Sequence, residues 1–380
     1  MNFDRLTQFI DSLLSYGIPG SDLLIQKNHQ TIYRHFHGWR DREAQIPLDG
    51  TELYYLYSCS KITTVTAAMQ LYEKGLFLLD DPLSLYLPEF ERMQVQMEDG
   101  SLHPAEHPIL IRHLFAMTAG FNYDLDIPGL SDVRAATGGA CSTREVMKLI
   151  ARTSLSFEPG TRWQYSLCHD VLAGVVEVIS GMKFRDYVQK NIFDPLGMCR
   201  SSYHPQAGRD ADFAAQYRFN DATRTAERIP LQSDYIFGTE YDSGGAGIIS
   251  SVEDYGRIVD ALACGGIGAT GEHILSRASI DLMRENQLNA AQMERDFVWQ
   301  QMCGYGYGLG VRTAVSRAAG GLLSPVGEFG WGGAAGAYIA IIPEEKISIY
   351  YGQHMLNSQE PYVHPRLRNI AYACMTSGAL

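Results

Sequence analysis

The chain has 380 residues, of which 46% are hydrophobic and 19% are charged. This length and balance are typical of a folded protein with a large core, and they exclude extensive disorder. Lys and Arg total 31 against 43 for Asp and Glu, which gives a formal net charge of −12. Because such a surface repels phosphate groups, we expect neither nucleic acid nor an anionic membrane surface as a partner.

The N-terminal segment is charged from Asp4 onward and places Leu6, Ile10 and Leu13 at helical spacing. This pattern predicts a first helix and lacks the basic start and unbroken apolar stretch of a secretory signal. No run approaches the ~20 apolar residues of a membrane span. The seven cysteines are scattered without a C-x-x-C pair, which favours a reducing compartment over a disulfide framework or a zinc site. We therefore expect a soluble, cytoplasmic protein.

Strand-like runs occur in two pairs, one near each end of the chain. Each pair flanks a short polar turn, which is the pattern of a β-hairpin. A final helical stretch is predicted from about Arg366 to Cys374. The four strand-like runs are residues 23–26, 31–36, 337–342 and 347–351.

The middle of the chain has a helical pattern instead. Apolar residues recur every three or four positions over 65–72 and 171–179. Gly75 and Gly181 stand where these helices would end, because glycine readily adopts the left-handed conformation of a helix C-terminus. The helices are separated by loops rich in proline and glycine.

The predicted fold class is therefore α/β (α+β). An antiparallel sheet built from both chain termini and flanked by helices carries an inserted, mainly helical lobe. We expect the active site at the interface between the two. The sheet domain is predicted to comprise residues 1–60 and 241–380, and the helical lobe residues 61–240.

A first candidate for chemistry is the pair Ser58 and Lys61 at the start of a predicted helix. Residues three apart share a helix face, so the hydroxyl and the amine can meet. A desolvated lysine can be neutral enough to take the serine proton, and a helix N-terminus offers free N–H groups beside the nucleophile. Alone, the S-x-x-K pattern is weak evidence. It recurs at 180–183, where a glycine interrupts the helix, and we attribute that copy to chance.

Two further segments complete the candidate site. Tyr165 precedes a helix expected to begin near Asp170, and it becomes a base only if cations such as Lys61 lower its pKa. Residues 329–336 are rich in glycine and lead into the C-terminal hairpin. Glycines beside a strand let a ligand approach the backbone, where a free N–H can stabilise an oxyanion. A tight bend at the sheet edge is the alternative interpretation of this segment.

In their order along the chain, these three segments resemble the S-x-x-K, tyrosine and Lys/His-x-Gly motifs of the serine β-lactamase-like superfamily. It includes class C β-lactamases, penicillin-binding proteins, D-amino-acid peptidases and family VIII carboxylesterases. The resemblance covers about residues 15–355. Further similar segments are residues 83–90, 112–120, 193–198, 244–251 and 305–310.

The resemblance implies that Ser58 is the acylated nucleophile and that Lys61 and Tyr165 share the acid and base roles. In the implied cycle Tyr165 acts as a phenolate assisted by Lys61, and no metal or cofactor takes part. The backbone N–H groups of Ser58 and Ala334 would form an oxyanion hole. Substrate-binding roles are implied for Trp331, Gly332, Gly333, Tyr123 and Leu167.

Two departures from the superfamily pattern indicate the substrate. Leu167 replaces the asparagine that binds the amide side chain of penicillins, and Trp331 replaces the cation that helps to hold the lactam carboxylate. Losing an amide contact and a charge-assisted hydrogen bond makes the cleft more apolar and less suited to an anionic lactam. The combination resembles the family VIII carboxylesterases.

We therefore expect a serine hydrolase that cleaves small carboxylic esters through an acyl-enzyme on Ser58. The alternatives are a β-lactamase or D-amino-acid peptidase or amidase, an acyltransferase, and a non-catalytic binding protein on the same scaffold. In each case the expected partner is a small molecule, an ester or an amide for the enzymes.

Overall fold

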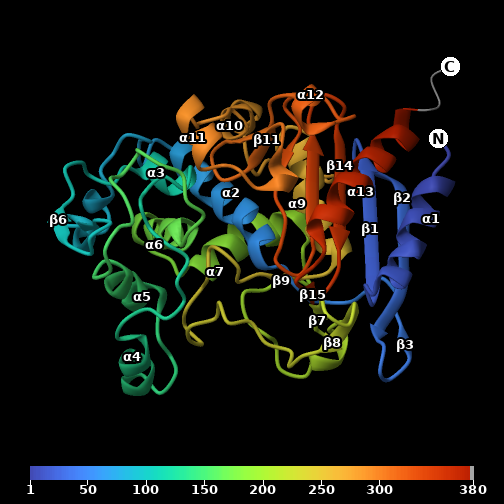
Figure 1. Cartoon of the computed structure of the whole chain (residues 1–380), viewed down its shortest axis with the longest axis horizontal. Helices are drawn as coiled ribbons and strands as arrows, with labels where there is room; N and C mark the ends of the chain where they lie inside the picture. The colour runs from blue at the N-terminus through green and yellow to red at the C-terminus, as the bar shows by residue number, and fades with distance from the viewer. Residues whose placement is uncertain (377–380) are drawn as a thin grey trace.

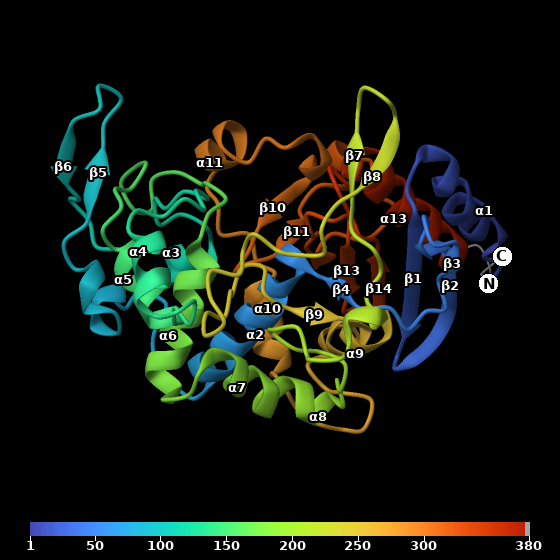
Figure 2. The ribbon, with the colours of Figure 1, turned by 90° about the horizontal axis from the view of Figure 1, so that it is seen from below.

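The computed structural model describes residues 1–376 of the chain. Figures 1 and 2 show a large sheet at one end of the molecule and a group of helices at the other, with helix α2 between them. The first and last helices, α1 (Asp4–Ser12) and α13 (Glu360–Thr376), pack against each other beside the sheet. The two ends of the described chain therefore lie on the same side of the molecule.

The main sheet has eight antiparallel strands, and its centre joins the N-terminal and C-terminal parts of the chain. Strand β1 pairs with β2 on one side and with β14 on the other, where Leu24 lies opposite Tyr350. Both predicted hairpins and the predicted fold class are confirmed. In order across the sheet, the strands are β10 (Tyr305–Tyr307), β11 (Arg312–Ala314), β12 (Phe329–Gly330), β13 (Tyr338–Ile342), β14 (Ile347–Gly352), β1 (Gly20–Lys27), β2 (Gln30–Asp41) and β3 (Ile46–Pro47).

Alternate side chains of the central strands face two different cores, because successive residues of a strand point to opposite faces of the sheet. Leu23 and Ile25 pack with α1 and α13, whereas Leu24 and Tyr350 pack with α9 (Val252–Ala263). Helices thus cover both faces of the sheet. This explains why the central strands are almost continuous apolar runs.

The helical end of the molecule is built largely from the middle of the chain. Gly75 and Gly181 follow α2 and α6 in the left-handed conformation, with φ of 67° and 68°, as the sequence predicts. Helix α6 begins at Cys168, slightly before the expected start at Asp170. The helices in this part are α2 (Ser60–Glu73), α3 (Ile111–Phe115), α4 (Leu130–Ala136), α5 (Thr143–Ile150), α6 (Cys168–Ser180), α7 (Phe184–Val188) and α8 (Asp194–Leu196).

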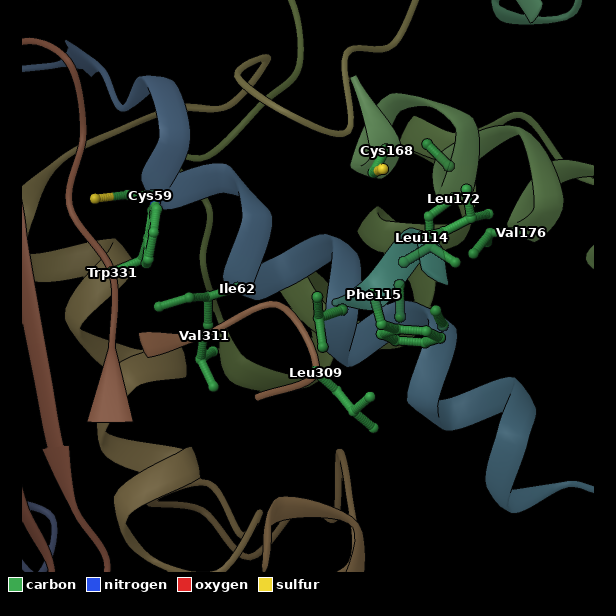
Figure 3. Packing of buried hydrophobic residues seen from close by; sticks show 14 of the residues in the cluster. Cys59, Ile62, Leu114, Phe115, Cys168, Leu172, Val176, Leu309, Val311 and Trp331 are labelled. Carbon is green, nitrogen blue, oxygen red and sulfur yellow. The ribbon is translucent and has the colours of Figure 1, made fainter. Parts of the chain in front are cut away.

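Helix α2 lies at the centre of the molecule. Its residues from Ser60 to Leu71 are all buried, which is typical of a helix enclosed on every side. Figure 3 shows Leu309 and Val311 on one side of α2 and Phe115 and Leu172 on the other. The same helix is therefore packed by both the sheet end and the helical end of the molecule.

The remaining helices and strands are short. Strand β7 pairs with β15, so residues 217–228 lie beside the C-terminal part of the chain although the predicted lobe extends to 240. The domain boundaries at 60 and 240 stay a prediction. Among the described residues, no helix has both the length and the apolar character needed to span a bilayer. The short elements are β4 (Tyr54–Tyr55), β5 (Gln94–Gln96), β6 (Leu102–Pro104), β7 (Tyr217–Asn220), β8 (Thr225–Arg228), β9 (Ile249–Ser250), β15 (Met355–Leu356), α10 (Arg277–Met283), α11 (Ala290–Arg295) and α12 (Arg317–Gly320).

Candidate active site

Ser58 lies in the single turn η2 (Tyr57–Cys59), between strand β4 and helix α2. The preceding residue, Tyr57, is buried and has a φ of 48°, a left-handed conformation that is rare for a bulky side chain. The N–H of Leu56 donates to the carbonyl of Ile248, which ties the start of the turn to the neighbouring strand. The side chain of Ser58 stays partly exposed while its chain neighbours are buried. The hydroxyl is thus presented from a tightly held turn.

Lys61 lies one helix turn beyond Ser58 and is fully buried. Its Nζ atom is 3.2 Å from Ser58 Oγ, which is the pairing that the S-x-x-K spacing predicts. Nζ also donates to the carbonyl of Gly245 at 2.8 Å and to the hydroxyl of Tyr123 at 3.1 Å. Three oxygen atoms therefore hold the amine beside the nucleophile.

Burial changes the acidity of this amine. Desolvation lowers the pKa of Lys61 from 10.5 to about 7, although the negative charge of Asp170 acts in the opposite direction. Near neutral pH a large fraction of the side chain is therefore a free amine. A neutral amine in contact with a hydroxyl can accept its proton, which is what nucleophilic catalysis by serine requires.

Tyr165, the third predicted catalytic residue, hydrogen-bonds with Ser58. Trp331 Nε1–H donates to its hydroxyl at 3.1 Å, the two rings stack with centroids 5.5 Å apart, and Lys61 Nζ lies 4.6 Å from the Tyr165 ring centroid. Burial raises the pKa of Tyr165, and the hydrogen bonds with Ser58 and Trp331 lower it by less. The expectation of a phenolate is therefore wrong, because desolvation of the phenol outweighs every contact that favours its charged form.

Tyr123, a predicted substrate-binding residue, contacts Lys61. Its hydroxyl accepts from Lys61, and its ring stacks on Tyr165 with centroids 5.2 Å apart. Burial raises the pKa of Tyr123 well above its usual value, so this second phenol is also protonated. The amine is thus in contact with two neutral phenols rather than with an ion-pair partner.

The glycine-rich segment approaches the backbone of the nucleophile turn. A Cβ atom on Gly333 would lie only 2.4 Å from the carbonyl oxygen of Leu56, so these two segments touch directly. Gly333 N–H donates to the carbonyl of Ala337 at 2.8 Å and closes the bend. Within the described residues, neither the N–H of Ser58 nor that of Ala334 has a hydrogen-bond acceptor. Both N–H groups are available to an oxyanion.

Asp170 is a buried residue that the sequence analysis missed as part of the site. Its Oδ1 atom accepts from Tyr241 at 2.6 Å, from Ser243 Oγ at 2.7 Å and from the N–H of Gly245 at 3.2 Å. These bonds hold residues 241–245 in place. The carbonyl of Gly245, at the end of this segment, accepts the hydrogen bond from Lys61. The sequence does contain one indication of this role, because Asp170 lies five positions after Tyr165, where a helix is expected to begin.

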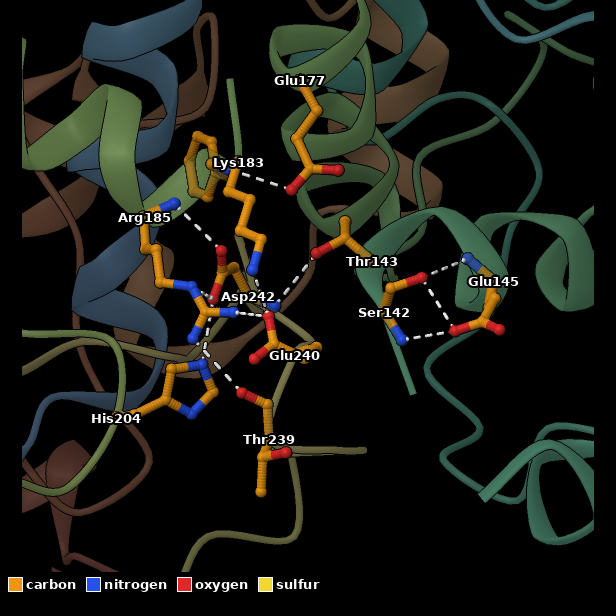
Figure 4. Close-up of polar contacts among 11 residues, drawn as sticks. Ser142, Thr143, Glu145, Glu177, Lys183, Arg185, His204, Thr239, Glu240 and Asp242 are labelled. Carbon is orange, nitrogen blue, oxygen red and sulfur yellow. Dashed lines mark hydrogen bonds and ion pairs between the residues drawn. The ribbon is translucent and has the colours of Figure 1, made fainter. Parts of the chain in front are cut away.

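The chain leading to this segment is anchored by ion pairs (Figure 4). Arg185 and Lys183 both contact Glu240 at 2.5 Å, and Arg185 Nε lies 3.3 Å from Asp242 Oδ1. Lys183 belongs to the second S-x-x-K copy, and its pairing with Glu240 at the surface gives it a structural role. The anchored stretch continues directly into Gly245.

The site opens into a cavity of about 600 Å³. Ser58 and Tyr165 line it together with Tyr123 and the segment from Trp331 to Ala334, including Gly332 and Gly333. Five more lining residues were not predicted, because they come from loops and a helix start without a recognisable motif. These are Tyr235, Trp299, Gln301, Met302 and Glu360.

Leu167, a predicted substrate contact, lies elsewhere. It is buried and lines a second cavity of about 620 Å³ together with Phe121 and Ile127. Its N–H donates to the carbonyl of Asn122 at 3.1 Å, which turns the chain away from Tyr165 before α6 begins. Leu167 therefore lines a different cavity from Ser58, and its contact with a substrate stays a prediction.

A serine hydroxyl beside a buried amine, a phenol and two free N–H groups, set against an antiparallel sheet, defines a serine hydrolase with a β-lactamase-like fold. A family model described as Beta-lactamase matches residues 4–374, and the chain belongs to this family.

Individual relatives extend this result. Esterase EstB of Burkholderia gladioli is 28% identical over 352 residues, which covers 86% of this chain and 84% of the esterase. The structure of EstCE1, described as a hydrolase with promiscuous acyltransferase activity, is 26% identical with a TM-score of 0.79, over 97% of this chain and 98% of its own. Simvastatin synthase LovD of Aspergillus terreus has a TM-score of 0.82 at 22% identity over 100% of both chains, a likeness of fold alone.

Proposed function

We propose that the protein hydrolyses small carboxylic esters through an acyl-enzyme on Ser58. The observation that carries this proposal is the position of Lys61 Nζ, 3.2 Å from Ser58 Oγ, in an environment that lowers its pKa to about 7. The esterase EstB, similar over most of both chains, supports the same reaction class.

In the proposed acylation, the neutral Lys61 amine takes the proton of Ser58 as Oγ attacks the ester carbonyl. The new Oγ–C bond turns the carbonyl oxygen into an oxyanion, which the N–H groups of Ser58 and Ala334 stabilise. Collapse of this intermediate breaks the bond to the alcohol. The alcohol leaves with the proton held by Lys61, and the protonated phenol of Tyr165 is suited to relay it.

Deacylation uses the same groups. Water gives a proton to Lys61 and attacks the acyl carbon, and collapse of the second intermediate breaks the Oγ–C bond. The proton returns to Ser58 and the carboxylic acid is released. A positioned base contributes about 10²- to 10⁴-fold and one oxyanion donor about 10²- to 10³-fold in rate, so both parts of the site matter.

The lining of the cavity supports an ester over a β-lactam or a D-amino-acid peptide. Trp331 presents an indole where penicillin-recognising proteins have a cation, and Glu360 adds a carboxyl group to the same cavity. Among the described residues that line it, none is Lys or Arg. An anionic substrate would lose a favourable charge contact and meet an unfavourable one.

Acyl transfer to an added alcohol is a second candidate. EstCE1, which is 26% identical, is described as a hydrolase with promiscuous acyltransferase activity. If the acyl-enzyme accepts alcohols in place of water, adding an acceptor alcohol will yield new ester at the expense of free acid. Product analysis by chromatography distinguishes the two reactions.

The proposal is tested with a fluorophosphonate probe and p-nitrophenyl butyrate. We expect the probe to add one label to the intact mass, on Ser58, and the ester to be hydrolysed. Ser58→Ala should abolish both, while Ser180→Ala, in the second S-x-x-K copy, should change neither. Faster turnover of nitrocefin than of p-nitrophenyl butyrate would contradict ester specificity. An unlabelled, inactive wild type would instead support a binding protein.

A further inference from the structure

The Ser58 cavity has an aromatic wall that extends beyond Tyr165 and Trp331. Tyr165 packs against Trp299 edge to face, with centroids 5.4 Å apart, and Tyr123 packs against Tyr235 in the same way at 5.7 Å. The ring centroids of Trp299 and Trp331 lie 6.2 Å apart, and these two rings form one end of the wall. The four rings other than Trp331 are partly exposed, so their surfaces are accessible to a ligand.

A carboxyl group lies in the same cavity. Glu360, the first residue of α13, is half-buried, and its hydrogen-bond partners are neutral: Ser358 Oγ donates to Oε1 at 3.2 Å, and Gln301 is the other. Arg312 acts on it at longer range, but that guanidinium is bonded to Glu328 at 3.1 Å and to the carbonyl of Ile339 at 2.7 Å. Within the described part of the chain, Glu360 has no ion-pair partner.

The charge around this carboxyl group is unbalanced. Burial raises the pKa of Glu360, which is the expected response of a carboxyl group that lacks a counter-ion. Lys61, the nearby buried amine, is about half neutral at pH 7 and mostly neutral above it, because its pKa is about 7. The whole chain has a formal charge of −12, which attracts cations over a distance.

We propose that Glu360 and the rings of Trp299 and Tyr235 form a subsite for a cationic group, a quaternary or protonated amine, carried by the ester substrate. Aromatic faces attract organic cations through their quadrupoles, and the carboxylate supplies the missing counter-charge. A quaternary ammonium suits such a wall well, because it keeps its charge at every pH and is less strongly hydrated than a metal ion. This substrate class rests on the proposed ester hydrolysis.

A pair of substrates with the same shape isolates the charge. Butyrylcholine and 3,3-dimethylbutyl butyrate differ only in having a quaternary nitrogen or a quaternary carbon in the alcohol. We expect kcat/KM to be about tenfold or more higher for the choline ester, as one desolvated cation–π contact with an adjacent carboxylate predicts. An equal or higher value for the neutral ester would overturn the proposal.

Single substitutions show which residues cause the preference for the choline ester. Glu360→Gln and Trp299→Leu should each lower the ratio of the two kcat/KM values by about threefold or more. Glu91→Gln removes the same charge from an exposed position outside the cavity and should leave the ratio unchanged. A ratio that falls equally in Glu360→Gln and Glu91→Gln would assign the preference to the overall charge and overturn the subsite.

A binding measurement separates this inference from the proposed reaction. Benzyltrimethylammonium is titrated into Ser58→Ala and followed by tryptophan fluorescence, since Trp299 and Trp331 line the cavity. We expect saturable quenching that Glu360→Gln weakens about tenfold. Saturable binding without any ester hydrolysis by the wild type would refute the proposed function and retain the subsite. Hydrolysis of p-nitrophenyl butyrate without binding of the cation would refute the subsite alone.

Discussion

The buried amine of Lys61 lies at the centre of the candidate site. Lys61 touches Ser58, Tyr123 and the carbonyl of Gly245, and it is the group whose pKa moves toward neutrality. The pKa values of both phenols move the other way. Near pH 7 the strongest base beside Ser58 is therefore the free amine of Lys61. The phenols of Tyr123 and Tyr165 stay protonated and act as hydrogen-bond partners.

The pH dependence of ester hydrolysis follows from this assignment. Because the proposed base is the neutral amine of Lys61 and its pKa is about 7, kcat/KM should rise with pH through that region and level off above it. Lys61→Arg keeps a cation that cannot lose its proton, so its activity should fall by about 10²- to 10⁴-fold at every pH. A pH-stat assay measures both. A kcat/KM that declines as the pH rises through 7 would contradict the amine as the base.

The two phenols should differ in importance. Tyr165→Phe removes the hydroxyl that bonds with Ser58 and Trp331, and we expect kcat to fall by about 100-fold, in the range of a lost proton-transfer group. Tyr123→Phe removes one acceptor of the Lys61 amine, and a loss of about tenfold or less is expected because two other oxygen atoms still hold Nζ. Steady-state kinetics of both variants on one ester show which variant loses more activity. Equal losses would show that the relay uses both phenols.

At the scale of elements, the site depends on the contact between the nucleophile turn η2 and the bend that follows β12. The bend contributes the N–H of Ala334, and the turn contributes that of Ser58. Their relative position is set by the close approach of Gly333 to the carbonyl of Leu56. Gly333 therefore sets how closely the segments that carry the two proposed oxyanion donors approach each other.

Gly333→Ala tests this control. The added methyl group would lie 2.4 Å from the Leu56 oxygen, so the bend must move and carry Ala334 with it. We expect kcat to fall by about 10²- to 10³-fold, the cost of one misplaced oxyanion donor, together with a lower melting temperature, because the clash is with backbone. Gly332→Ala is the matched variant, since its methyl group would meet the Ala337 oxygen at 3.3 Å and needs a far smaller shift. Similar losses in both variants would argue against a specific role for the Gly333 contact.

At the scale of the whole molecule, one core unites the sheet and the helices. The cluster that surrounds α2 includes Leu172 and Val175 of α6 as well as Phe329 and Ile339 of the sheet. The two ends of the molecule therefore share their apolar contacts, and neither has a separate core facing α2.

We expect this shared core to unfold as one unit. Differential scanning calorimetry should show a single transition with equal calorimetric and van't Hoff enthalpies. Val65→Ala, which truncates a fully buried side chain of α2, should shift the whole transition to lower temperature without splitting it. Two resolved transitions in the wild type would contradict a common core.

Local spacing accounts for the parts of this arrangement that the sequence predicts. Ser58 and Lys61 are one helix turn apart, and hairpins such as β13–β14 are signalled by two short apolar runs on either side of a polar turn. Glu360 and Trp299 have no such signal, because they reach the cavity only through the packing of distant loops.

The acidity of the buried groups also depended on tertiary structure. The sign of the Tyr165 pKa shift was predicted wrongly because it depends on how many apolar groups surround the phenol, and a sequence motif does not encode that number. The position of Leu167 depends on tertiary structure in the same way. A single turn before α6 decides which of two cavities its side chain faces.

The pairing of β1 with β14 has a consequence for how the protein reaches its native state. It brings residues 22–27 beside residues 347–352, so the centre of the sheet closes a loop of nearly the entire chain. Closing so long a loop is entropically costly and slows folding. In a circular permutant, a short linker would connect α13 to α1, and new ends would be opened in the turn between β5 and β6, at the far end of the molecule (Figure 2). That permutant would turn this pairing into a nearby contact and should fold faster around an unchanged active site.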